Sequence, residues 1–186
     1  MSGANGRDRG KSVQWYQTVF ELIDMRSFSN LWFWIVLAVL WSTVSHYVLG
    51  VPFDMVTRAR RIGGQAQTDL EDMVRINVNR RLYIARVSGL WMVALVTGGL
   101  TALALLGFVY RVQFAQALFL LFAPVALVGV LSLRAAARIE DQGPQGEALC
   151  RFLVRHRLQI QLVGIVAIFV TAMWGMWQNM NVSAFR

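Results

Sequence analysis

The chain has 186 residues, of which 56% are hydrophobic and 15% are charged, and its formal net charge is +8. This composition is too apolar for an ordinary soluble domain of this length, so we expect an integral membrane protein. The single cysteine, Cys150, excludes an intrachain disulfide and a metal cluster held by several cysteines of one chain. The sequence also lacks a phosphate-binding loop, a dinucleotide fingerprint and a nucleic-acid-reading motif, so we expect no nucleotide chemistry and no binding of nucleic acid.

The amino-terminal part of the chain is polar at first and then amphipathic. Residues 1–12 lack the apolar core of a secretory signal and are rich in Gly, Asn and charged side chains, so we expect them to be disordered. In residues 13–29, Trp15, Val19 and Leu22 share one side of a helix. This segment is too short and too charged to cross a bilayer. We expect a helix that lies in the headgroup plane or packs across the mouth of a helical bundle.

Four apolar runs in residues 30–186 predict a membrane domain. Each is about as long as the roughly 20 helical residues that a bilayer requires. None contains Asp, Glu, Lys or Arg, and the four runs are residues 31–51, 87–110, 112–133 and 159–178. The link between the second and third runs is little more than Arg111, which predicts a tight antiparallel hairpin. We therefore expect an all-α fold, an integral membrane four-helix bundle of two antiparallel hairpins with helical extensions on the cytoplasmic side.

The connection formed by residues 52–86 is polar and predicts two helices. The first covers residues 53–61 and ends at Gly63-Gly64. The second is expected to begin with the capping box Thr68-x-x-Glu71 and to carry the ion pair Glu71–Arg75. An apolar stripe at helical spacing follows, made of Leu70, Val74, Val78 and Leu82. No helix breaker separates this helix from the second apolar run, so we expect a continuous rod that projects from the membrane.

The connection formed by residues 134–158 contains the turn Gly143-Pro144-Gln145-Gly146 between two helical flanks. The two connections together carry twelve arginines, against six basic residues elsewhere in the chain. The positive-inside rule therefore predicts that both connections are cytoplasmic and that both termini lie outside. Because the preference for arginine over lysine is typical of a GC-rich genome, we expect a multi-pass protein of a bacterial inner membrane.

Small residues at a spacing of four predict close helix packing in two of the apolar runs. One set is Ala94, Gly98 and Ala102, and the other set is Ala167, Thr171 and Gly175. Pro124 is expected to kink the third run unless neighbouring groups bond to the carbonyl that it leaves free.

His46 is the ionisable residue inside a predicted span, and Ser42 and Ser45 share its side of the helix as a polar seam. His156 lies on the apolar side of the helix that leads into the fourth span. Two interpretations stay open. Either the two histidines ligate a haem b from both sides, or His46 is neutral and bonded to a serine or carbonyl while His156 lies at the headgroups. We expect no cofactor and no metal, with haem b on His46 and His156 as the alternative.

The connection formed by residues 52–86 also carries an arginine cluster. These side chains either bind lipid headgroups or an acidic protein partner, or simply form solvated faces beside the membrane. The residues concerned are Arg58, Arg60, Arg61, Arg75, Arg80 and Arg81.

Several runs carry a resemblance to a known family: residues 20–32, Ser45-His46, residues 50–56, residues 69–80 and residues 169–179. These runs resemble a family of small alphaproteobacterial membrane proteins of essentially this length. Some members are labelled "component of SufBCD complex", the iron–sulfur assembly scaffold. The resemblance implies that the basic cytoplasmic connection is a docking surface, and it supplies no catalytic residues.

Three functions follow as hypotheses. The first is a non-catalytic membrane subunit or anchor, not an enzyme, that docks a protein partner through its basic cytoplasmic connections. The second is a small haem b electron-transfer protein. The third is a protein that binds or transports a lipid or small solute, with a cavity near His46 and Pro124.

Overall fold

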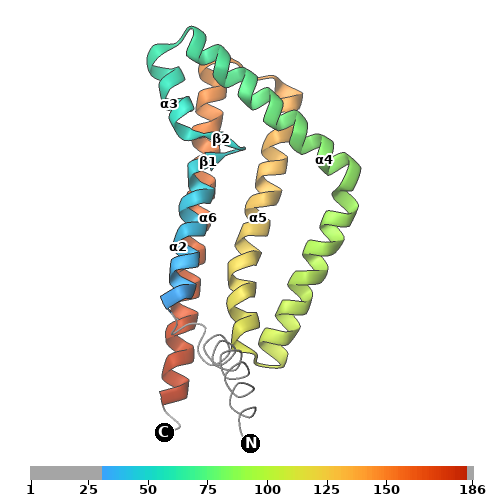
Figure 1. Ribbon diagram of the computed structural model, residues 1–186, viewed down its shortest axis with the longest axis vertical. Helices are drawn as coiled ribbons and strands as arrows, with labels where there is room; N and C mark the ends of the chain where they lie inside the picture. The colour runs from blue at the N-terminus through green and yellow to red at the C-terminus, as the bar shows by residue number, and fades with distance from the viewer. Residues whose placement is uncertain (1–30, 184–186) are drawn as a thin grey trace, which may run out of the picture.

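The structure, a computed structural model, describes residues 31–183, with side chains described as far as Met180. The predicted segments 1–12 and 13–29 lie outside the described residues. The elements in chain order are α2 (Leu31–His46), β1 (Tyr47–Val48), β2 (Val51–Pro52), α3 (Phe53–Ile62), α4 (Gln65–Ala104), the π-helical turn η2 (Leu105–Val109), α5 (Gln113–Gln142) and α6 (Gly146–Ser183) (Figure 1). The described chain is therefore almost entirely helical, as its sequence predicts.

Three of the described helices are long and apolar enough to cross a membrane: α4 with η2, α5 and α6. The fourth apolar helix, α2, has 16 described residues. The prediction that the first span continues to residue 51 is wrong. The chain leaves the helix after His46 and forms an antiparallel hairpin in which Val48 pairs with Val51. Leu49 and Gly50 form its turn with φ of 54° and 83°, a left-handed conformation that glycine adopts without strain.

The polar end of the molecule is a packed unit, which we call the head (residues 47–86 and 134–158). Its core joins the hairpin, α3, the first half of α4 and the adjoining ends of α5 and α6. The predicted stripe on α4 is confirmed, because its four side chains are all buried in this core: Leu70, Val74, Val78 and Leu82. Burying one such side chain contributes about 1.5–3 kcal/mol.

The first half of α4 crosses the ends of α5 and α6 and then turns down alongside α5 (Figure 1). The expected projecting rod is therefore wrong, although α4 is continuous over 40 residues. The reason is that a free rod would leave the apolar stripe in water, whereas the crossing buries it. The second half of α4 is the least packed part of the molecule, and residues 90–99 are all exposed.

A second core lies in the apolar part of the molecule and joins α2, α5 and α6. Leu37 and Trp41 of α2 pack there with Leu121 of α5 and Ile160 of α6. Helix α2 runs beside α6 (Figure 1). Both cores therefore meet near His46, where α2 ends and the head begins.

The helix ends differ in part from what the sequence predicts. The capping box at Thr68 is wrong, because α4 already begins at Gln65 and the Thr68 hydroxyl bonds back to the Gly64 carbonyl at 3.4 Å. The ion pair of Glu71 with Arg75 is also wrong, since Arg75 pairs with Asp72 at 2.9 Å. The turn that begins at Gly143 is confirmed: this residue ends α5 with a left-handed φ of 53°.

Candidate functional site

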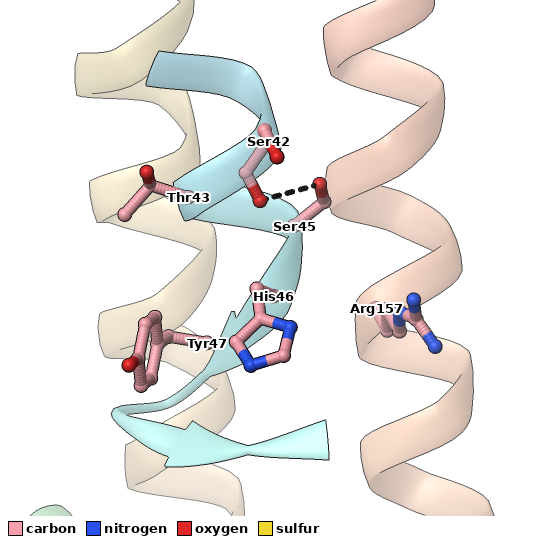
Figure 2. A pocket seen from close by; sticks show the side chains of 6 residues that line it. All are labelled: Ser42, Thr43, Ser45, His46, Tyr47 and Arg157. Carbon is pink, nitrogen blue, oxygen red and sulfur yellow. Dashed lines mark hydrogen bonds between the residues drawn. The ribbon is translucent and has the colours of Figure 1, made fainter. Parts of the chain in front are cut away.

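A polar pocket of about 370 Å³ lies where α2 ends and the head begins. Ser42, Thr43, Ser45 and His46 of α2 line it together with Tyr47 of β1, and Arg157 of α6 lines it from the facing helix (Figure 2). The predicted seam of Ser42, Ser45 and His46 is therefore one wall of this pocket. From the sequence, Arg157 was only one of the twelve arginines of the two connections.

The hydroxyl groups of the pocket differ in how they are bonded. The Ser45 hydroxyl donates to the Trp41 carbonyl at 2.6 Å and lies 3.2 Å from the Ser42 carbonyl. The Thr43 hydroxyl donates to the Val39 carbonyl at 2.8 Å. Both protons are thus used within α2. The Ser42 hydroxyl makes no such bond among the described residues and is free to donate into the pocket.

The two remaining pocket groups are a histidine and an arginine. The exposed His46 ring packs edge-on against Tyr47, with ring centroids 5.1 Å apart. The Arg157 guanidinium carbon lies 3.8 Å from the centre of the Phe53 ring, a cation–π contact that fixes its position. Its Nε–H is buried and has no hydrogen-bond partner among the described residues. None of the ion pairs of the described chain includes Arg157.

His156 belongs to a different environment. Its ring is buried against α5, where Nε2 lies 3.4 Å from the Ser132 hydroxyl. It lines a pocket of about 190 Å³ between α5 and α6 that shares no residue with the pocket of His46. The structure therefore does not bring the two histidines into one pocket, and the haem alternative stays a prediction. Among the described residues, no group of three or more His, Cys, Asp or Glu side chains could hold a metal ion.

The predicted arginine cluster lies on the outside of the head. Arg58, Arg60 and Arg61 are exposed on α3, whose Val56 and Ala59 face the core. On α4, Arg75 and Arg80 are exposed, whereas Arg81 is half-buried beneath the hairpin tip, where burial lowers its pKa. The ion pairs of the described residues are Arg75–Asp72, Arg86–Glu140 and Arg151–Glu147. The three arginines of α3 take part in none of them.

The two sets of small residues that predicted close helix packing differ in their burial. Ala167, Thr171 and Gly175 of α6 are all buried, as expected for a close helix contact. Ala94, Gly98 and Ala102 of α4 are all exposed, and a Cβ added at Gly98 would meet no atom within 4 Å. No described residue packs against Gly98, and the close contact predicted for this set stays a prediction. Pro124 lies inside α5, which continues past it to Gln142.

A buried glutamine that the sequence analysis did not single out joins three helices at the far end from the head. Gln116 of α5 donates to the Gly107 carbonyl of η2 at 2.7 Å. Its side-chain oxygen accepts from Trp174 at 3.1 Å and from Gln178 at 2.9 Å, both on α6. The sequence offered one signal for this network, a glutamine inside an apolar run. It did not predict the partners of Gln116, because the π-helical turn at Gly107 could not be foreseen.

Comparison with protein-family models, with curated proteins and with solved structures found no match to this chain. The class of protein is therefore defined by the fold alone. The described chain is almost entirely helical, and three of its helices are long and apolar enough to cross a membrane. The resemblance to the alphaproteobacterial family stays a prediction.

Proposed function

We propose that the protein is a non-catalytic anchor in a bacterial inner membrane that docks a protein partner through the arginine face of α3. The single observation that carries this proposal is the exposure of Arg58, Arg60 and Arg61 on a packed head, with no acidic partner among the described residues. Three neighbouring cations that form no ion pair in the described chain attract an acidic surface and speed association with it.

The head supports docking because it holds this face rigidly. Val56 and Ala59 are buried with 0% and 2% exposure, so α3 cannot turn without opening the core. Gly63 and Gly64 then lead directly into α4, whose apolar stripe packs on the same core. A surface that is already ordered loses less conformational entropy when a partner binds.

We place the head in the cytoplasm, because twelve of the basic residues lie in residues 52–86 and 134–158. In this arrangement α4, α5 and α6 cross the bilayer, and α2 completes a four-helix bundle of two hairpins. The 16 described residues of α2 extend about 24 Å through the bilayer.

The test is photo-crosslinking in membranes from a photoreactive residue at Ile62, an exposed position beside the arginine face. The account predicts one dominant crosslinked protein, which is lost when Arg58, Arg60 and Arg61 are all changed to Glu. The family resemblance makes a component of the iron–sulfur assembly scaffold the first partner to test.

The matched control is another triple change to Glu on the same head, at the exposed positions Arg134, Arg138 and Arg155. This control reverses the same amount of charge away from α3 and should leave the crosslink in place. If both triple variants lose the crosslink equally, the attraction is a general charge effect and the proposed docking face is wrong.

A further inference from the structure

The pocket at the end of α2 combines an unneutralised cation with polar walls. Arg157 has no ion-pair partner among the described residues, and its buried Nε–H has no hydrogen-bond partner there. The Nε atom itself is closed to a ligand, but Arg157 also lines the pocket, so an anion bound there would neutralise a charge that no ion pair of the described chain neutralises.

Arg157 is also held in place before any ligand arrives. Its guanidinium group packs over the Phe53 ring at 3.8 Å, so the side chain gives up little further freedom when it binds. The planar guanidinium fork suits two oxygens of one phosphate or carboxylate group. In Figure 2 the His46 ring lies between Tyr47 and Arg157, with Ser42 and Ser45 above it. The free Ser42 hydroxyl and an N–H of His46 are therefore further donors for the same anion.

The position of the pocket indicates which anion reaches it. Its lining begins where the apolar sequence of α2 gives way to Ser42, Thr43 and Ser45, and it ends at the head. In a membrane protein this boundary lies at the level of the lipid headgroups. Ile35, Val36 and Val39 are exposed on the preceding turns of α2 and offer an apolar surface beside the pocket.

We propose that this pocket binds the phosphate group of an anionic phospholipid. Arg157 bonds the phosphate oxygens, Ser42 and His46 donate to the same group, and the acyl chains lie along the exposed apolar side chains of α2. This site is separate from the arginine face of α3, and its occupancy does not depend on the proposed docking function. Free inorganic phosphate has the same binding chemistry, so the experiment must distinguish the two sources.

The test measures lipid bound to the purified full-length protein after incubation with phosphatidylglycerol or phosphatidylcholine in mild detergent, followed by gel filtration and mass spectrometry. We expect stronger retention of phosphatidylglycerol than of phosphatidylcholine, because the choline ammonium group cancels the charge of the phosphate and is repelled by Arg157. Arg157→Gln should weaken that binding about tenfold, because it removes a charge-assisted hydrogen bond. The matched control, Arg155→Gln, removes the same charge from an exposed position two residues away and should leave retention unchanged.

A second variant keeps the test valid if Arg157→Gln disturbs the contact with Phe53. Ser42→Phe fills the pocket from an exposed position on α2 and leaves Arg157 in place. With an unchanged gel-filtration profile, it should also lose the lipid. Equal lipid retention by the wild type and by both pocket variants would overturn the proposal. Displacement of the lipid by millimolar inorganic phosphate would overturn the lipid assignment and make the free anion the ligand.

Discussion

The Glu71 carboxylate of α4 accepts a hydrogen bond of 2.7 Å from the backbone N–H of Gly146, the first residue of α6. The same oxygen accepts from the Gln67 side chain at 2.9 Å, and Gln67 lies 3.3 Å from the Gly146 carbonyl. A negative charge at the N-terminus of a helix bonds an otherwise free N–H and opposes the positive end of the helix dipole. This contact joins residues 75 positions apart in the sequence and fixes α4 across the end of α6.

Removal of this cap should loosen the head. We expect Glu71→Ala to lower the free energy of unfolding by about 1–2 kcal/mol, the usual cost of a lost helix cap. Glu71→Gln should cost less, because its amide oxygen still accepts a hydrogen bond. Thermal unfolding followed by circular dichroism in detergent measures both. Asp69→Ala is the control, since Asp69 is exposed and its carboxylate accepts a hydrogen bond from the neighbouring Gln65 side chain of the same helix. Equal losses for Glu71→Ala and Asp69→Ala would contradict this role.

Helix α2 packs on α6 where Gly164 lies beneath the Trp41 ring. A Cβ added at Gly164 would lie 2.8 Å from a carbon of that ring, so the ring would have to move. Gly164→Ala should therefore destabilise the protein by about 1–3 kcal/mol through overpacking. In contrast, Gly98→Ala meets open space and should be neutral or stabilising by up to about 1 kcal/mol, because alanine favours a helix. Melting temperatures in one detergent compare the two, and an unchanged melting temperature for Gly164→Ala would refute the close contact.

The Gln116 network should stabilise the end of the molecule opposite the head. Gln116→Leu leaves the Gly107 carbonyl and the Trp174 and Gln178 donors without this partner, which should cost about 1–3 kcal/mol. Gln113→Leu is the control, because it makes the same change at a less buried position of the same helix. Resistance to unfolding by sodium dodecyl sulfate, followed by tryptophan fluorescence, should fall for Gln116→Leu and not for the control.

Cys150 should react slowly in the folded protein. The side chain is 1% exposed within the head, and burial raises the pKa of its thiol. The reactive thiolate is therefore scarce at neutral pH and forms only as the pH approaches the raised value. We expect slow alkylation by iodoacetamide until the chain is unfolded. In a Cys150→Ser background, Ala148→Cys places a thiol at an exposed neighbouring position, which should react at once. Fast alkylation of native Cys150 would show that the head core is open.

Local patterns made part of this fold predictable. The apolar stripe from Leu70 to Leu82 follows helical periodicity, and the turn at Gly143 follows from residues that cannot continue a helix. The hairpin after His46 was missed because its residues are as apolar as the helix before it. Leu49 takes a left-handed conformation there, and its side chain is only 1% exposed. This conformation depends on packing in the head core, which a local sequence pattern does not reveal.

Contacts between distant residues were not predictable from local patterns. Thr68 and Glu71 have the spacing of a capping box, yet Glu71 caps a helix that begins at Gly146. Arg157 contributes to the charge asymmetry like any other arginine, and its pocket exists only because α2 ends opposite it. Small residues permit close packing without requiring it, which explains why the set on α6 is buried and the set on α4 is exposed.

We propose that the head lies in the cytoplasm and that the apolar helices cross the membrane. Single cysteines introduced in a Cys150→Ser background test it most directly, with Arg61→Cys in the head and Arg111→Cys at the opposite end; both positions are exposed. The account predicts that a membrane-impermeant maleimide labels Arg111→Cys in intact spheroplasts and labels Arg61→Cys only after lysis. Labelling of Arg61→Cys in intact spheroplasts would place the head outside and contradict the account.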